Sequence, residues 1–121
     1  MAYTQDEFKK RTKQFALRVI RLVNSLPTTL AADKIGGQLL KAGTSVAANY
    51  RAACRGRSPG EFCAKLGIVE EEADESIFWM ELLVDSKMVK SQLVTDLMGE
   101  ANEILAMVVA SIRTAKRKQQ R

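Results

Sequence analysis

Apolar residues recur along the chain at the three- and four-residue steps that place one stripe on an α-helix, and they do so in four successive segments. The first segment follows the capping-box spacing of Thr4 and Glu7 and ends at Pro27. Its stripe consists of Phe8, Phe15, Val19, Leu22, Val23 and Leu26. We therefore expect a first helix that buries this stripe and turns its lysines and arginines outward.

The second segment begins near Thr28 or Thr29 and is rich in small residues. Its apolar stripe consists of Leu30, Ile35, Leu39, Ala42, Val46, Tyr50 and Ala53. Glycine inside a helix costs about 0.5 to 1 kcal/mol relative to alanine. The presence of Gly36, Gly37 and Gly43 therefore favours the close approach of another helix, with sequence drift as the alternative.

A tight corner is predicted where the second segment meets the third. Ser58, Pro59 and Glu61 match the N-cap, the first position and the capping-box acid of a new helix. Gly56 is expected to end the preceding helix in the left-handed conformation. A phosphate-binding loop would need a preceding strand and a Gly-Lys-Ser/Thr ending, and the sequence has neither.

The third helix is predicted from residue 59 to about residue 84, and a fourth follows Asp85-Ser86-Lys87. Their stripes consist of Phe62, Leu66, Val69, Ala73, Ile77, Met80 and Leu83 or Val84, and of Leu93, Leu97, Ala101, Ile104, Leu105, Val108 and Ile112. Phe78 and Trp79 lie off the third stripe, where either another subunit or full packing within one chain would cover them. Short links between long amphipathic segments predict one all-α domain over residues 1–121, an up-down-up-down antiparallel four-helix bundle.

Charge is arranged in blocks, although the whole chain carries a net charge of only +5. Residues 1–57 hold 11 basic and 3 acidic side chains, and residues 58–112 hold 3 basic and 11 acidic ones. The excess therefore lies in a basic C-terminal tail at residues 113–121, which has no acid. Complementary helix faces and a basic arm for an anionic partner are the two interpretations.

Composition argues against several classes of function. The chain has no histidine, which removes the commonest general base and metal ligand, so we expect no enzyme, no cofactor and no metal. The acidic run around Glu71 and Glu75 is then a solvated face or a partner for basic helices. Cys54 and Cys63 are expected to be reduced. With no apolar run of membrane length and no export leader evident, we expect a cytoplasmic protein and no membrane partner.

Seven basic residues are candidates for nucleic-acid binding. Arginine forks match phosphates as well as carboxylates, and no aromatic residue interleaves with the tail to stack on bases. We therefore expect non-specific contact with RNA or DNA phosphates. Pairing with Glu70, Glu71 or Asp74, and the favourable position of cations at a helix C-terminus, are the structural alternatives. The candidates are Arg51, Arg55, Arg57, Arg113, Lys116, Arg117 and Lys118.

Several motifs resemble one known family. They are Gly37-Gln38-Leu39, Gly43-Thr44-Ser45-Val46-Ala47-Ala48-Asn49-Tyr50, Gly56-Arg57-Ser58-Pro59-Gly60-Glu61-Phe62, Glu72-x-x-Glu75 and Leu82-Leu83. Together they resemble the small four-helix bundle proteins encoded within intervening sequences of 23S ribosomal RNA genes. The resemblance implies a homopentameric ring and brings no catalytic residues. It also implies kinship with accessory proteins of diversity-generating retroelements, which associate with nucleic acid and a reverse transcriptase.

One segment departs from this family pattern. Where many relatives carry Ala-Glu-Gly, this chain has Arg51-Ala52-Ala53-Cys54-Arg55, which adds positive charge in place of an acid. Asn49 is expected to bond across a helix interface, and Asn49, Tyr50, Phe78 and Trp79 are the predicted interface residues. We thus expect an oligomer, in the first instance a pentamer, that binds nucleic acid. The alternative is a protein-interaction scaffold, with a reverse transcriptase or another protein as partner.

Overall fold

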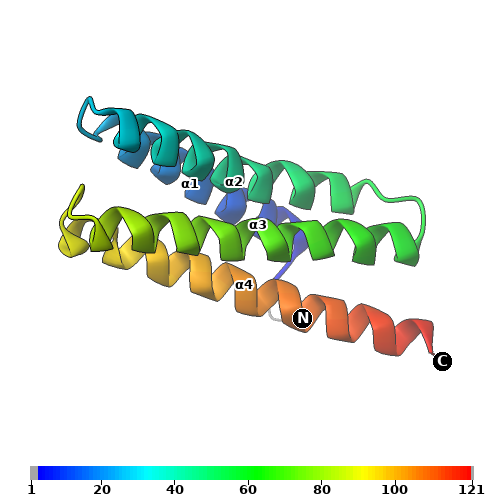
Figure 1. Ribbon diagram of the computed structural model, residues 1–121. Helices are drawn as coiled ribbons and strands as arrows, with labels where there is room; N and C mark the ends of the chain where they lie inside the picture. The colour runs from blue at the N-terminus through cyan, green and yellow to red at the C-terminus, as the bar shows by residue number, and fades with distance from the viewer. Residues whose placement is uncertain (1–2, 121) are drawn as a thin grey trace.

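The computed structural model describes residues 3–120, which form the four helices predicted from the sequence: α1 (Gln5–Asn24), α2 (Leu30–Cys54), α3 (Pro59–Asp85) and α4 (Ser91–Gln119). Short connections join them, and consecutive helices lie antiparallel and side by side (Figure 1). Each helix packs chiefly on the next one in sequence, and α1 contacts α4 least. The all-α four-helix bundle is therefore confirmed. No helix within residues 3–120 is long and apolar enough to cross a membrane.

Side-chain caps fix where the first three helices begin. The hydroxyls of Thr4, Thr29 and Ser58 each accept a hydrogen bond from a backbone N–H three residues further on, at 3.1 Å. These bonds satisfy amide groups that have no partner within the helix. The helix starts predicted from the sequence are confirmed for all three.

Gly56 does not play the conformational role expected of it. No glycine within residues 3–120 has a positive φ, and α2 ends instead at Arg55 with φ −97° and ψ 5°. The prediction of a left-handed Gly56 is wrong. A Cβ at Gly56 would lie 3.1 Å from the Ala53 carbonyl oxygen and 3.2 Å from the Phe62 nitrogen. The corner therefore needs glycine for space, because backbone from α2 and α3 passes close to it.

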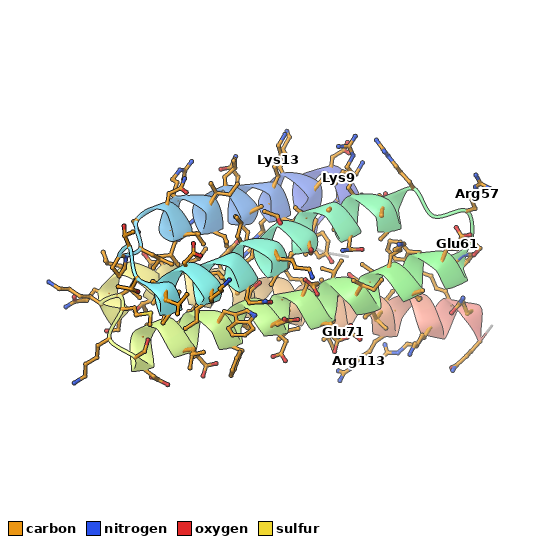
Figure 2. The ribbon with its side chains drawn as sticks, turned by 45° about the horizontal axis from the view of Figure 1, so that its top comes forward. Lys9, Lys13, Arg57, Glu61, Glu71 and Arg113 are labelled. Carbon is orange, nitrogen blue, oxygen red and sulfur yellow. The ribbon has the colours of Figure 1, made fainter. Side chains whose placement is uncertain are left out.

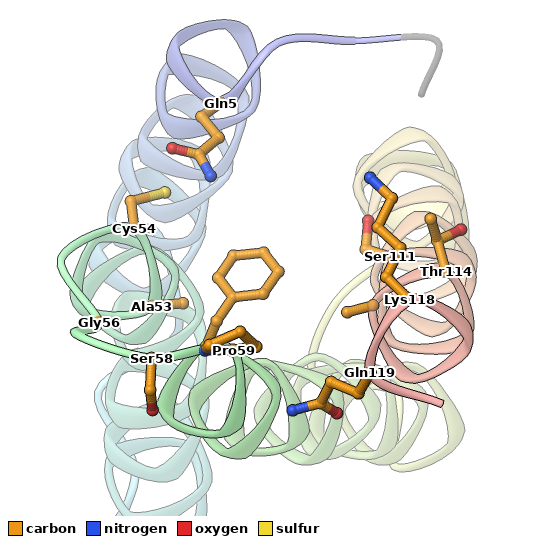
Figure 3. A pocket seen from close by; sticks show the side chains of 12 residues that line it. Gln5, Ala53, Cys54, Gly56, Ser58, Pro59, Ser111, Thr114, Lys118 and Gln119 are labelled. Atoms are coloured by element: carbon orange, nitrogen blue, oxygen red, sulfur yellow. The ribbon is translucent and has the colours of Figure 1, made fainter. Parts of the chain in front are cut away.

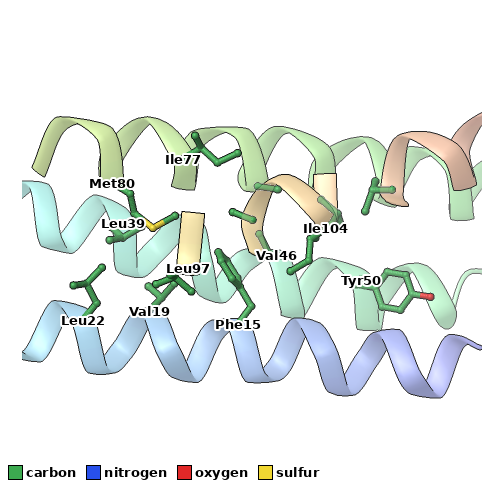
Figure 4. Close-up of a cluster of buried hydrophobic side chains, with 14 of the residues drawn as sticks. Phe15, Val19, Leu22, Leu39, Val46, Tyr50, Ile77, Met80, Leu97 and Ile104 are labelled. Carbon is green, nitrogen blue, oxygen red and sulfur yellow. The ribbon is translucent and has the colours of Figure 1, made fainter. Parts of the chain in front are cut away.

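The apolar stripes meet in one core along the bundle axis (Figure 4). Its largest fully buried side chains come from all four helices and include Phe8, Phe15, Leu39, Leu66, Met80, Leu83 and Ile104. Two predicted core residues are exposed, Leu30 at 77% and Leu93 at 68%. Both lie in the first turn of a helix on a side away from the core, while Ala32 in α2 and Val94 in α4 are buried in the same turns. The stripe assignment is therefore wrong at these two positions.

Polar contacts close the seam between α1 and α4. The Arg11 guanidinium donates to both carboxylate oxygens of Glu100, at 2.7 Å each, and to Oε2 of Glu103 at 2.6 Å. Hydrogen bonding to Arg11 lowers the pKa of Glu100 below its ordinary value, against the opposing effect of burial. Nearer the start of α1, the hydroxyls of Tyr3 and Ser111 are hydrogen-bonded to each other. The seam is thus held by ion pairs as well as by apolar packing.

Candidate nucleic-acid interface

The antiparallel topology brings the two groups of predicted basic residues to the same end of the bundle. The end of α2, the start of α3 and the end of α4 lie together at the right of Figure 1. Arg51 and Arg55 lie at the end of α2, Arg57 lies in the loop between α2 and α3, and the basic C-terminal residues lie at the end of α4. Residues more than fifty positions apart in sequence therefore share one end, which we call the basic end.

A pocket of about 430 Å³ lies between the two groups (Figure 3). It opens beyond the start of α1 at Gln5, because α4 continues past that point as far as Gln119. One wall comes from the α2–α3 corner, and the other comes from the last turns of α4. The lining includes Ala53, Cys54, Gly56, Ser58, Pro59 and Phe62 on one side and Ser111, Thr114, Ala115 and Lys118 on the other. The corner and the C-terminal cations thus border a common hollow.

The corner arginines share this end, but they do not converge on one point. Arg51, Arg55 and Arg57 are all exposed. Arg51 lines a groove against α1, whereas Arg55 lines a different groove against α3, beside Lys65. The guanidinium groups of Arg51 and Arg55 therefore share the end of the bundle but border different grooves. The helical packing of α2 between two neighbours separates them.

Arg57 lies in the loop of the corner, next to an acid. Its backbone N–H donates to Oε2 of Glu61 at 2.6 Å, while the Glu61 N–H donates to the Ser58 hydroxyl at 3.1 Å. The capping box therefore forms with a shift, because Glu61 reaches back past the N-cap residue to the one before it. Its side chain and that of Arg57 lie at the right-hand end of Figure 2. The corner is thereby fixed in shape while the Arg57 side chain stays exposed.

The basic tail is a helical extension of α4. Arg113, Lys116, Arg117 and Lys118 all lie within α4 and are exposed. Three of them occupy its last turn, where cations interact favourably with the negative end of the helix dipole. Arg121, the last residue of the predicted tail, lies outside the described residues. These cations are consequently held in fixed positions around the helix axis.

None of the seven candidate cations forms an ion pair within residues 3–120. The ion pairs there join Lys9 to Asp6 and Arg11 to Glu100 and Glu103. The alternative pairing of the arginines with Glu70, Glu71 or Asp74 is not formed inside the chain. The acidic run instead faces outward at Glu71, Asp74 and Glu75. Its inner member, Glu72, is half-buried, and burial raises the pKa of its carboxyl.

The predicted interface residues fall into two classes. Asn49 Nδ2 donates to the Ser45 carbonyl of its own helix at 2.9 Å, so the expected bond across a helix interface is not formed within the chain. Tyr50 is only 2% exposed and packs edge-on against Phe8 in the core. Phe78 is 53% exposed, and its ring packs edge-on against that of Trp79, with the two ring centroids 4.9 Å apart. The α3 surface around Phe78 and Trp79 is therefore the apolar face that the sequence led us to expect.

Sequence reasoning overlooked three cations that the structure places beside Arg51. Lys9, Lys10 and Lys13 of α1 line the same groove as Arg51 of α2. A signal was present in the sequence, since residues 8–24 and 34–57 contain no acidic side chain. Periodicity alone does not say which faces of two helices meet. The sequence therefore could not show that these lysines lie beside Arg51, which only the packed helices reveal.

The fold and this surface define a class, an antiparallel four-helix bundle with exposed cations gathered at one end. Comparison with known proteins gives the family. The model of the 23S rRNA-intervening sequence protein family matches residues 5–110, and the chain belongs to this family. A crystal structure of a protein of unknown function from the S23 ribosomal protein family of Bacteroides thetaiotaomicron is similar, with 28% identity and a TM-score of 0.84. The match covers 90% of this chain and 97% of the other. No curated protein matches the chain.

Proposed function

We propose that the protein is a non-catalytic oligomer whose basic end binds the phosphates of RNA or DNA without reading their sequence. The observation that carries this proposal is the gathering of seven exposed cations from two distant segments at one end, with no acid paired to any of them within residues 3–120. Exposed arginine and lysine without local acids favour an anionic partner.

The chemistry of this end favours backbone contacts over base contacts. Guanidinium and ammonium groups bind phosphate oxygens, and such contacts carry no sequence information. The exposed aromatic pair, Phe78 and Trp79, lies on α3 and not among the cations of the end. Base stacking is therefore not part of the proposal. The description of the family, which refers to 23S rRNA intervening sequences, makes RNA the first ligand to test.

Assembly into a ring would repeat the basic end around an axis. The exposed Phe78 and Trp79 supply an apolar contact surface, and the sequence resemblance implies five copies. Linked weak sites gain affinity through effective concentration, so a ring would strengthen contacts that are weak in one subunit.

The test removes three cations from the last turn of α4, in the variant Lys116→Gln/Arg117→Gln/Lys118→Gln. Binding of a single-stranded RNA oligonucleotide is measured across a salt series. We expect weaker binding and a shallower salt dependence, by about 2 in the slope of log affinity against log salt, because each phosphate contact on a single strand contributes about 0.7. A control variant, Arg21→Gln/Lys34→Gln/Lys90→Gln, removes the same charge at the opposite end. Equal RNA affinities and equal salt slopes for the two variants would contradict the proposal.

The second candidate function is a protein-interaction scaffold, favoured by the exposed Phe78. Its partner would be a reverse transcriptase or another protein, as the resemblance noted in the sequence implies. RNA binding would then vanish at about 0.15 M salt, where charges more than about 8 Å apart are screened. Gel filtration with light scattering, with absorbance recorded at two ultraviolet wavelengths, separates the two functions. An oligomer that purifies with nucleic acid supports the first, and one that purifies without it supports the second.

A further inference from the structure

A second cluster of four cations lies along the side of the bundle, and three of the four are not among the seven candidates from the sequence. Lys9, Lys10 and Lys13 on α1 and Arg51 on α2 line a groove of about 470 Å³. The side chains of Lys9 and Lys13 project from the outer face of α1 in Figure 2, whereas Arg113 lies on the opposite side of the bundle. The groove therefore widens the cationic surface from the end onto the α1–α2 flank.

The shape of the groove follows from the sequence of α2. Thr44, Ala47, Ala48 and Arg51 recur at three- and four-residue steps, so they occupy one face of the helix, and all four line the groove. The first three are short, and α1 and α2 pack closely at Gly43, where a Cβ would lie 2.8 Å from Val19. Short side chains thus form a floor between the longer cations.

Three of the four cations of the groove form no ion pair within residues 3–120. On α1, acids occur only in the first turn, at Asp6 and Glu7. Asp6 Oδ1 lies 3.7 Å from Lys9 Nζ, and this ion pair is exposed to solvent. On α2 the one acid is Asp33, in the first turn at the opposite end. Arg11, the other cation of this part of α1, is engaged with α4. Like charges brought together in this way repel each other and favour a bound anion.

The groove offers cations but few other polar groups. The Thr44 hydroxyl donates to the Leu40 carbonyl at 2.8 Å, which occupies its proton within α2. No aromatic side chain lines the groove, so it has no platform for a base. From Thr44 to Arg51 the floor extends about 10 Å along the helix axis, at about 1.5 Å per residue. The groove is therefore long enough for one strand to pass several of its cations.

We propose that this groove binds the sugar-phosphate backbone of the same nucleic acid that the basic end holds, and that Arg51 connects the two surfaces. The inference rests on the proposed function, since the ligand is shared. It adds a path: the strand leaves the basic end and runs along the α1–α2 flank, which makes affinity depend on strand length.

The test uses Lys9→Gln/Lys10→Gln/Lys13→Gln, whose residues belong to the groove alone. Single-stranded RNA binding is measured over a salt series with a short and a long oligonucleotide. For the long strand we expect a loss of about tenfold in affinity and a slope that is shallower by about 2, since three contacts at about 0.7 each disappear. For the short strand, which the basic end holds, the loss of affinity should be smaller. The charge-preserving variant Lys9→Arg/Lys10→Arg/Lys13→Arg should keep the wild-type slope.

The control is the opposite-end variant Arg21→Gln/Lys34→Gln/Lys90→Gln, with circular dichroism to confirm that every variant is folded. If the groove variant matches this control while the variant of residues 116–118 loses binding, the groove inference is wrong and the proposed function stands. If both variants match the control, or if the wild type does not bind RNA, the groove inference and the proposed function are both wrong. If the groove variant lost the same affinity for the short and the long oligonucleotide, the path along the flank would also be wrong.

Discussion

Gly43 shows how a single missing side chain sets the distance between two helices. A Cβ there would lie 2.8 Å from both γ-carbons of Val19, a residue that is fully buried. Gly37, two turns earlier in α2, has nothing within 4 Å of the corresponding position. The prediction from the sequence that glycines mark a close approach is therefore confirmed for Gly43 and for Gly36, where a Cβ would lie 2.8 Å from the Leu26 side chain, and it is wrong for Gly37.

Gly43→Ala is expected to destabilise the protein by about 1 to 3 kcal/mol, because the added methyl group overpacks the α1–α2 contact. Gly37→Ala in the same helix should stabilise it by about 0.5 to 1 kcal/mol, since alanine loses less backbone entropy on folding. Urea unfolding followed by circular dichroism measures both. Equal free energies of unfolding for the two variants would show that the helices are not in close contact at Gly43.

Among the elements, α1 and α4 depend most on polar contacts to stay together. Glu100 is part-buried at the seam, and its pKa is lowered chiefly by its hydrogen bonds to Arg11. A carboxyl with a lower pKa in the folded state adds stability above its unfolded pKa. This contribution is present above the ordinary value of 4.5 and is lost as the pH falls through the lower folded value.

Glu100→Gln is expected to lower the free energy of unfolding by about 1 to 2 kcal/mol at pH 7, because a charge-assisted bond becomes a neutral one. The difference from the wild type should shrink as the pH falls from about 4.5, where the carboxyl of the unfolded chain takes up a proton, through the lower pKa of the folded state. Glu103→Gln is the control, and its more exposed pair should contribute less than about 1 kcal/mol. A difference that stays constant from pH 7 to pH 3 would disprove the ion-pair account. Denaturant unfolding at several pH values provides the measurement.

Over the whole molecule, charge and apolar surface are placed on different faces. The cations gather at the basic end and on the α1–α2 flank, while the exposed aromatic pair and the outward acids Glu71 and Glu75 belong to α3. Trp79 Nε1 donates to Glu75 Oε1 at 3.3 Å, which orients the indole at this surface. Self-assembly through α3 would therefore leave the cationic surfaces open to a ligand.

Phe78→Ser is expected to reduce the mass of the oligomer, because it removes the most exposed aromatic ring of α3 without opening the core. Leu93→Ser, at an exposed apolar position in the first turn of α4, is the matched control and should leave the mass unchanged. Light scattering coupled to gel filtration reports the mass. If the wild type elutes with the mass of a single chain, the proposed assembly into an oligomeric ring is wrong.

The sequence by itself determined the helices and their starts. Caps and apolar stripes act between residues three or four positions apart, so Thr4 and Ser58 could be assigned before any packing was known, and the second cap was narrowed to Thr28 or Thr29. It also indicated the family, through motifs that the family match bears out. Local rules were misleading at Leu30 and Leu93, because spacing did not show that these first-turn residues face away from the core, where Ala32 and Val94 are buried instead.

Only the tertiary structure decided which charges share a surface. Arg51 and Arg55 stand four residues apart yet line different grooves, and Lys13 joins Arg51 from another helix. Likewise, the last turn of α4 borders the same pocket as Gly56, more than fifty residues away. Such proximities depend on the rotation of each packed helix about its axis and on the direction in which it runs. Both are set by how all four stripes fill one core, which no single segment of the sequence contains.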